Sequence, residues 1–165
     1  MNVQVLLMVF LPFVHASWKS KCKIPSEWIR QADNVCYKTQ GHTYGSFTVL
    51  QDCELFAIRL EHVSGDLNCN TADHSSSRWG CKEIGFETVL LKDHKLWYPN
   101  ESKSRAEFDL PGFNLMDDVV VYKKRANVTK GEEMQIAYGE DFENYKEGDN
   151  GNRQHCVHVD FSCIV

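Results

Sequence analysis

Short runs of this sequence alternate between apolar and polar residues with a period of two, and this pattern constrains the fold more than any other feature. In 53–63, which reads CELFAIRLEHV, Phe56, Ile58 and Leu60 fall on one face and the residues between them on the other. A period of two is typical of a strand with one buried face. Similar runs recur at 46–50, 84–91, 119–122, 134–138 and 155–161.

Clusters of turn-forming residues, such as 92–95 (KDHK) and 110–112 (LPG), separate these runs. Only 25–32 (PSEWIRQA) has a helical pattern, in which Ser26 would cap a helix with Trp28, Ile29 and Ala32 on one side. Many short strands with so little helix predict an all-β fold. We therefore expect an antiparallel β-sandwich or jelly roll, stabilised by disulfides, with one short N-terminal helix.

Residues 1–16 have the features of a secretory signal peptide. An apolar run from Val5 to Val14 is too short to cross a bilayer as a helix, and it ends at Val14-His15-Ala16, a small-residue cleavage pattern. No later segment is apolar over the roughly 18 residues that a membrane span needs. The sequence thus predicts a single secreted, extracellular domain over 17–165.

The cysteine content fits an oxidising compartment. Seven cysteines lie beyond the expected cleavage site: Cys22, Cys36, Cys53, Cys69, Cys81, Cys156 and Cys163. In a secreted chain such a set predicts a disulfide framework. Because seven is odd, one thiol is left to stay free, to be buried, or to bond to a second chain.

Strand geometry limits how these cysteines pair. If Cys156 and Cys163 lie in one extended strand, their Cα atoms are about 23 Å apart, beyond the roughly 7 Å that a disulfide allows. Pairs that close short loops are then preferred. The predicted bonds are Cys22 with Cys36, Cys69 with Cys81, and Cys53 with either Cys156 or Cys163.

Two acceptor triplets, Asn100-Glu101-Ser102 and Asn127-Val128-Thr129, predict N-glycosylation at Asn100 and Asn127. The net charge of -5 leaves no basic face that could hold phosphates. Nucleic acid is therefore not an expected partner.

The acidic segment 138–152 (YGEDFENYKEGDNGN) has two interpretations. Its carboxylates Asp141, Glu143, Glu147 and Asp149 could surround a calcium ion, which takes six to eight oxygen ligands, although their spacing is not that of an EF-hand. Alternatively, 149–152 (DNGN) forms a type I′ hairpin turn and the carboxylates face water. The second interpretation is preferred, and it predicts that calcium barely changes the melting temperature.

The run 155–161 (HCVHVDF) places Cys156, His158 and Asp160 on the face opposite to His155. His158 and Asp160 are two residues apart on one strand, so they could form half of a zinc site. The other histidines do not complete it at a recognised spacing.

Three aromatic residues, Trp79, Trp97 and Tyr98, lie in or near predicted loops and could stack on a sugar ring. The competing interpretation is that they fill the edges of the core. No GxSxG nucleophile motif is present.

The C-terminal part resembles a cysteine-containing module of secreted and matrix-associated animal proteins. A strand that ends in Tyr-Gly-Glu-Asp (138–141) leads through an acidic turn (149–151) to a final Cys-Val-x-Val strand (156–159). The resemblance implies an extracellular, non-catalytic role. We therefore expect a binding or matrix module whose partner is a protein or a glycan. A secreted defence or venom-type protein that acts on cell surfaces and a secreted hydrolase are the alternatives.

Overall fold

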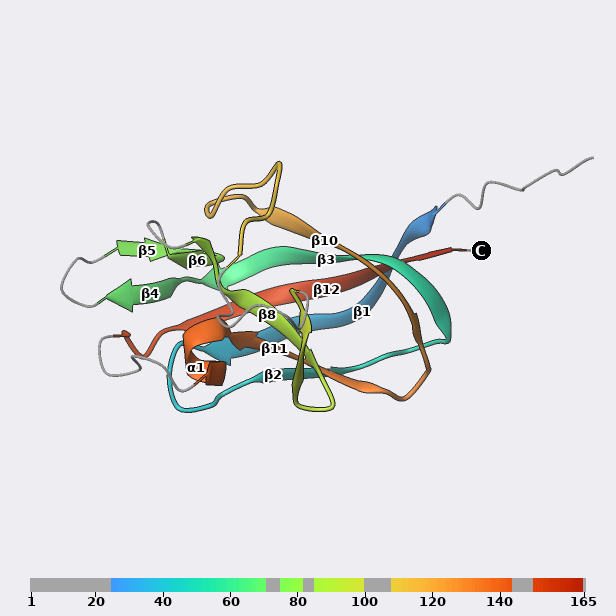
Figure 1. Ribbon diagram of the computed structural model, residues 1–165, viewed down its shortest axis with the longest axis horizontal. Helices are drawn as coiled ribbons and strands as arrows, with labels where there is room; N and C mark the ends of the chain where they lie inside the picture. Colours follow the sequence, from blue (N-terminus) through green and yellow to red (C-terminus); the bar gives the residue numbers. More distant parts are fainter. Residues whose placement is uncertain (1–24, 71–74, 82–84, 100–107, 144–149, 165) are drawn as a thin grey trace, which may run out of the picture.

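The computed structural model describes residues 25–70, 75–81, 85–99, 108–143 and 150–164. The predicted signal peptide, Cys22, Asn100, Glu147 and Asp149 lie outside these residues. The described chain is mostly β structure in antiparallel sheets, which confirms the predicted all-β class (Figure 1).

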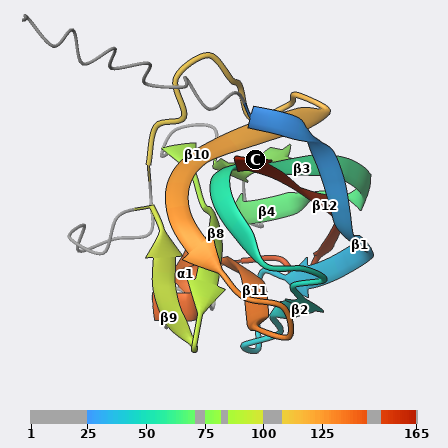
Figure 2. The same ribbon diagram turned by 90° about the vertical axis from the view of Figure 1, so that its right-hand side faces the viewer.

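Two four-stranded sheets make up most of the structure. In spatial order, the first sheet contains β1 (Pro25–Lys38), β12 (Gln154–Ile164), β3 (Cys53–Gly65) and β10 (Val119–Val128). The second contains β2 (Gly45–Thr48), β11 (Glu133–Tyr138), β8 (Thr88–Lys92) and β9 (Lys95–Tyr98). Figure 2 shows β1 and β9, each at an edge of its sheet, on opposite sides of the molecule.

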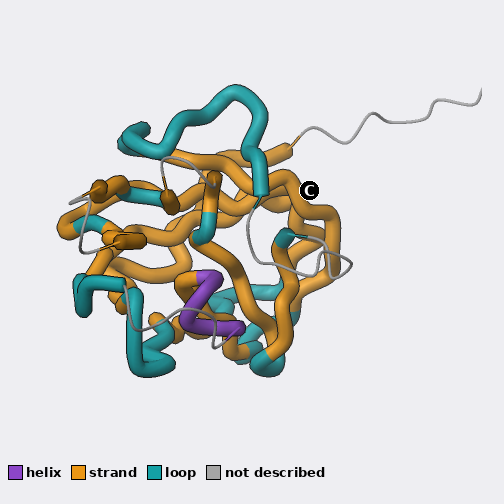
Figure 3. The backbone as a smooth tube through the Cα atoms, turned by 60° about the vertical axis from the view of Figure 1, so that its left-hand side comes forward, coloured by secondary structure: helices purple, strands orange, loops and turns teal. Residues whose placement is uncertain are grey.

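Two short ribbons and one helix complete the described elements. The ribbons pair β4 (Leu67–Asn70) with β5 (Ser75–Ser77) and β6 (Gly80–Cys81) with β7 (Gly85–Phe86). The helix α1 (Gly139–Glu143) is the one purple segment in Figure 3. With five residues, α1 is far too short to cross a membrane, and the described part of the chain contains no helix that could.

Each of the six alternating runs of the sequence overlaps a strand, although 46–50 extends beyond β2 and 84–91 is divided between β7 and β8. The predicted N-terminal helix is wrong. Residues 25–32 form the start of β1, where Ile29 pairs with Phe161 and Arg30 with Asp160 of β12. The backbone of β1 gains its hydrogen bonds from a strand more than a hundred residues away. This long-range pairing overrides the weak local preference for a helix.

Side chains from both sheets meet in one core. The ring of Phe47 on β2 lies edge-on to Phe161 on β12, with centroids 6.1 Å apart. The Tyr122 hydroxyl on β10 donates to the carbonyl of Thr88 on β8 at 3.1 Å. Phe47, Phe161 and Tyr122 are all buried. The two sheets are therefore held together by contacts between apolar side chains and by hydrogen bonds inside the core.

The alternation predicted for β12 is confirmed, whereas that for β3 is correct only in part. Val157, Val159 and Phe161 are fully buried in the core. On β3, Ile58 also belongs to the core, but Phe56 does not, and its ring lies 5.5 Å from the guanidinium carbon of Arg125. A register shift between Leu55 and Ala57 in the pairing with β12 accounts for the change of face.

Two disulfides fasten β12 to its neighbours. Cys36–Cys156 joins it to β1, and Cys53–Cys163 joins it to β3. The predicted Cys22–Cys36 bond is therefore wrong, because Cys36 and Cys156 stand directly opposite each other in the β1–β12 register. Of the two partners proposed for Cys53, Cys163 is confirmed.

The predicted bond between Cys69 and Cys81 lies partly outside the described side chains. Cys81 is disulfide-bonded, whereas the side chain of Cys69 is not among those described.

The turns differ in how well the sequence predicted them. Asp93 and His94 connect β8 to β9 with φ of 52° and 58°, so the turn predicted at 92–95 is confirmed. The hairpin predicted through Asn150 and Gly151 is wrong. The strands before and after this segment, β11 and β12, belong to different sheets and α1 follows β11 directly.

Candidate functional site

The connection between β1 and β2, residues 39–44, lies against the segment that precedes β12. The Lys38 amide donates to the carbonyl of Thr43 at 3.0 Å, and the Thr39 amide donates to the carbonyl of Arg153 at 3.1 Å. The Thr39 hydroxyl also donates to the carbonyl of Gly151. These bonds fix the backbone of the connection on both sides.

Asp141 of α1 is the buried charged group beside this connection. It is 0% exposed, and its Oδ1 accepts a hydrogen bond from the His42 amide at 2.9 Å. Its Oδ2 is also buried and accepts no hydrogen bond from any described residue. Leaving a carboxylate oxygen without a partner is costly, because the oxygen has lost its water. The chemistry of Oδ2 therefore calls for a cation or a hydrogen-bond donor.

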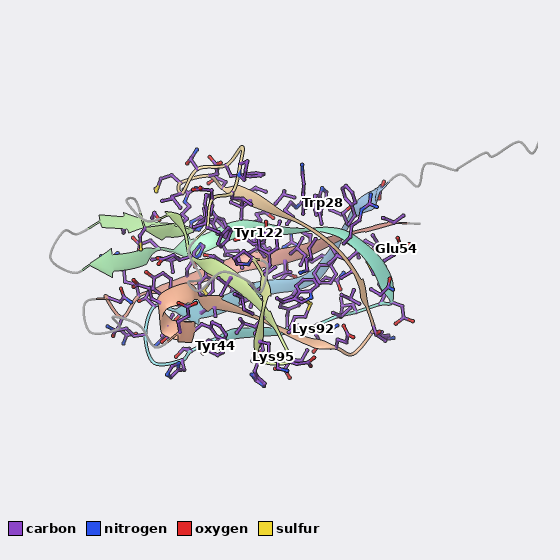
Figure 4. All side chains as sticks on the ribbon, viewed as in Figure 1. Trp28, Tyr44, Glu54, Lys92, Lys95 and Tyr122 are labelled. Atoms are coloured by element: carbon purple, nitrogen blue, oxygen red, sulfur yellow. A yellow bond between two sulfur atoms is a disulfide. The ribbon has the colours of Figure 1, made fainter. Side chains whose placement is uncertain are left out.

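Aromatic residues adjoin Asp141, because Phe142 follows it in the chain and Oδ1 of Asp141 binds the backbone of His42. The rings of Tyr44 and Phe142 have centroids 6.4 Å apart, and those of His42 and Tyr44 are 6.3 Å apart. Tyr44 and Phe142 are half-buried and His42 is exposed. Figure 4 shows Tyr44 beside α1 at one end of the molecule. We call His42, Tyr44, Asp141 and Phe142 the aromatic corner.

Asn150 is a second buried polar group held by the same connection. It is 2% exposed, and its backbone carbonyl accepts a hydrogen bond from Nε2 of Gln40. Neither Nδ2 nor Oδ1 of its side chain has a hydrogen-bond partner among the described residues. An amide supplies one acceptor and two donor positions, so Asn150 adds neutral binding groups to this end of the molecule.

The four carboxylates proposed for calcium have different surroundings. Asp141 is buried, so the preferred expectation that these carboxylates face water is wrong for it. Glu143 is exposed. Within the described ranges, no three His, Cys, Asp or Glu side chains converge as a metal site.

The aromatic residues that the sequence suggested for sugar stacking contribute to packing. Trp79 is fully buried, and its Nε1 donates to the carbonyl of Asp117 at 2.7 Å. Trp97 is half-buried, and the Lys124 ammonium lies 5.2 Å from its ring centroid. Trp79 therefore has no free face to offer a ligand, and one side of Trp97 is covered by a cation.

Tyr98 packs toward the interior. Its ring lies 4.8 Å from that of Tyr122 and 5.6 Å from that of Phe108, between centroids. Burial raises the pKa of its hydroxyl above the ordinary value. The competing interpretation, that aromatic side chains fill the core edges, describes Tyr98 well.

His158 and Asp160, the proposed half of a zinc site, lie on the outer face of the first sheet, where Nδ1 of His158 accepts from the Asn34 amide at 3.3 Å. Asp160 accepts from Nε of Arg30 at 2.7 Å and from Nε of Arg59 at 3.0 Å. His158 Nδ1 lies 3.0 Å from Oδ1 of Asp33. Both carboxylate oxygens of Asp160 are thus already paired with cations.

A chain of hydrogen bonds runs through the core between the sheets. The Thr88 hydroxyl donates to the carbonyl of Trp79, so its oxygen accepts from Tyr37 at 2.7 Å. Because the Tyr37 hydroxyl donates its only proton to Thr88, its oxygen accepts a hydrogen bond from Nδ1 of His155 at 2.8 Å. Nε2 of neutral His155 must accept from Nδ1 of His62 at 2.9 Å. The partners thereby fix the tautomers of both histidines.

Burial, together with the charges of the neighbouring His62 and Arg78, lowers the pKa of His155 to about 3. Burial also lowers the pKa of His62, and Arg78 acts in the same direction. His155 is 0% exposed, so this chain of hydrogen bonds has no direct access to solvent at its centre. We assign it to the stability of the fold.

The aromatic corner was not predicted as a site from the sequence. His42 and Tyr44 form part of 41–45 (GHTYG), a turn between two glycines, and of the four residues of the aromatic corner only Asp141 is among the candidates that the sequence suggests. A turn that carries two ring side chains is a signal that could have been noticed. Its position beside Asp141 depends on contacts between residues about a hundred positions apart.

No family model matches the sequence, and no curated protein matches it. A solved structure, that of AJLec from the sea anemone Anthopleura japonica, is similar with a TM-score of 0.72 and 24% sequence identity. The match covers 84% of this chain and 98% of that chain. This protein and AJLec therefore share a fold.

Proposed function

We propose that this protein is a secreted, non-catalytic glycan-binding module, with the two sheets arranged as a β-sandwich and the aromatic corner as its binding site. AJLec, which is similar in fold, is a sea anemone lectin. The two disulfides of the described chain fit an extracellular location.

The observation that carries this proposal is the buried Oδ2 of Asp141, which has no hydrogen-bond partner among the described residues, next in the chain to Phe142, whose ring centroid lies 6.4 Å from that of Tyr44. A sugar has an apolar face of C–H groups and a rim of hydroxyls. Aromatic rings pack against the C–H face of the sugar, and carboxylate or amide groups bind its hydroxyls. The aromatic corner and Asn150 together supply both kinds of group.

Calcium forms part of the proposal. Asp141 offers a buried anionic oxygen and Asn150 an amide oxygen, and neither has a hydrogen-bond partner among the described residues. Hard cations such as calcium take ligands of this kind. When bound, the ion would neutralise the carboxylate and offer open coordination positions to sugar hydroxyls.

The first experiment measures glycan binding. The purified full chain is applied to an array of mammalian and microbial glycans, and the strongest ligand is titrated by calorimetry. We expect Tyr44→Ala and Asp141→Asn to weaken binding at least tenfold. Asn at position 141 keeps an oxygen that can accept from the His42 amide, so this variant isolates the charge.

Two variants make the controls. Trp97→Ala tests the stacking position suggested by the sequence, and Asp93→Asn removes an exposed carboxylate in the β8–β9 turn. Neither should change the affinity. Loss of binding in Trp97→Ala with full binding in Tyr44→Ala would move the site away from the aromatic corner, and a chain that binds no glycan would refute the proposed function.

A second experiment tests the ion. Melting temperatures are compared in EDTA, in millimolar magnesium and in millimolar calcium. An ion that binds only the native state stabilises it by about 2.7 kcal/mol at one hundred times its Kd. We expect a rise in calcium that is absent in Asp141→Asn. Glycan binding that persists in EDTA would show instead that Oδ2 meets a sugar hydroxyl directly.

A further inference from the structure

A groove of about 520 Å³ opens among β3, β10 and β12 where β3 begins and the other two end. Its volume lies in the range of ligand pockets. The buried residues that line it are Val128 and the disulfide-bonded Cys53 and Cys163. Ile29 and Ile164, both half-buried, add apolar surface. The apolar lining is therefore held rigidly by a covalent bond between two strands.

Exposed polar residues also line this groove. They are Gln51, Asp52, Glu54, Asn127 and Thr129. An apolar surface bordered by amides and carboxylates suits a sugar, because its ring carries both C–H groups and hydroxyls.

Asn127 lines the groove and is also a predicted N-glycosylation site. It is exposed on β10, an edge strand of the first sheet, and it begins the acceptor triplet Asn127-Val128-Thr129. All three residues of the triplet line the groove. A glycan attached to the Asn127 amide would therefore start inside the groove.

We propose that Asn127 carries an N-linked glycan whose first sugar rings pack into this groove. The covalent attachment keeps these rings at a high effective concentration, so contacts too weak to retain a free sugar are sufficient. Figure 4 shows Glu54, which lines the groove, at the opposite end of the molecule from Tyr44 of the aromatic corner. The attached glycan thus leaves the proposed binding site open.

This inference does not depend on the proposed function, and its test uses different measurements. The full chain is secreted from a eukaryotic host, and glycopeptide mass spectrometry measures occupancy at Asn127. Thr129→Ala abolishes the acceptor triplet and keeps the asparagine, whereas Thr129→Ser keeps the triplet. We expect the first variant to lose the glycan and to melt about 3 °C lower than the second.

A third variant separates packing in the groove from a general effect of glycosylation. Ile164→Ala is made with and without Thr129→Ala, and the four melting temperatures form a double-mutant cycle. We expect Ile164→Ala to remain fully glycosylated and to lose at least half of the stabilisation that the glycan provides. A change in the intrinsic stability caused by Ile164→Ala cancels in this comparison.

Two results would overturn the inference. If Asn127 is unmodified in a chain that is secreted and folded, no attached glycan exists to occupy the groove. A modified Asn127 whose glycan adds the same stability with and without Ile164→Ala would show that the sugars extend into solvent.

Discussion

Asp160 illustrates how much one side chain contributes when it is buried between two cations. Its side chain is 3% exposed and contacts Arg30 and Arg59, whereas Asp33, which also contacts Arg30, is 71% exposed. We expect Asp160→Asn to lower the free energy of unfolding by about 2 kcal/mol, less than for a fully buried pair because the two arginines are partly solvated.

The matched control for Asp160→Asn is Asp33→Asn. Because the Asp33 carboxylate is exposed, its loss should change the free energy of unfolding by less than about 0.5 kcal/mol. Urea titrations of both variants measure the difference. Equal losses in the two variants would contradict the importance assigned to burial.

His155 makes the protein sensitive to acid. Its pKa in the folded state, about 3, lies below that in the unfolded chain, so the unfolded chain takes up a proton first as the pH falls. The stability that His155 contributes is present above its ordinary pKa of 6.5 and decreases as the pH falls toward 3. Between pH 6.5 and 5 we expect a loss of up to about 1.4 kcal/mol per pH unit.

This pH dependence is measured by urea unfolding at several pH values. His155→Gln should reduce the slope between pH 6.5 and 5, although it lowers stability at pH 7. His94→Gln, at an exposed turn, should leave the slope unchanged. A slope that survives in His155→Gln would assign the acid sensitivity to other groups.

For single residues, the sequence predicted which side of a strand a side chain faces. It did not predict the surroundings of residues whose neighbours come from distant segments of the chain. The alternation in β12 correctly separated Val157, which packs in the core, from Asp160, which pairs with Arg30 and Arg59. Nothing in the sequence showed that Asp141 is buried, because the His42 amide that binds it lies in another element. Trp79 likewise sits near a predicted loop but packs on His155, with ring centroids 4.9 Å apart.

Among the elements, the β8–β9 hairpin contains avoidable strain. Asp93 and His94 both adopt positive φ, which glycine tolerates better than a residue with a Cβ. We expect His94→Gly to raise the free energy of unfolding by about 0.5–1 kcal/mol. Thermal unfolding measures the change, and Lys95→Gly, one position into β9, should be destabilising instead. A loss of stability in His94→Gly would contradict the strain assigned to the positive φ of His94.

The elements were predictable where a local pattern determines them. The six alternating runs identify strands because burial of one face requires a period of two. The N-terminal helix and the bond between Cys22 and Cys36 were wrong for one common reason. Both relied on neighbours in sequence, whereas β1 takes its hydrogen bonds and the disulfide of Cys36 from β12.

For the whole molecule, the disulfide between Cys53 and Cys163 has a large expected effect on stability. The bonded residues are 110 positions apart in sequence. In the chain-entropy model, closing a loop of this length stabilises the fold by about 4–5 kcal/mol. We expect the double variant Cys53→Ala/Cys163→Ala to lose a stability of this order in urea titrations at pH 7.

Peptide mapping without reduction provides the independent check on the disulfides. The Cys36–Cys156 and Cys53–Cys163 peptides should both be recovered from the purified protein. Recovery of a Cys22–Cys36 peptide in place of the first would contradict the register of β1 and β12.

The position of β12 also determines when the domain can fold. It is the last described strand in the chain, yet it lies between β1 and β3 and is disulfide-bonded to both. At about 5–20 residues per second, a ribosome needs roughly 6 to 23 s to translate from the end of β1 at Lys38 to the start of β12 at Gln154. Until then β1, and β3 once it is synthesised, lack their shared partner. In the secreted chain that we propose, oxidising enzymes meet Cys36 and Cys53 before the correct cysteines exist. A premature stop codon between β3 and residue 154 would then produce a substrate for quality control in the secretory pathway.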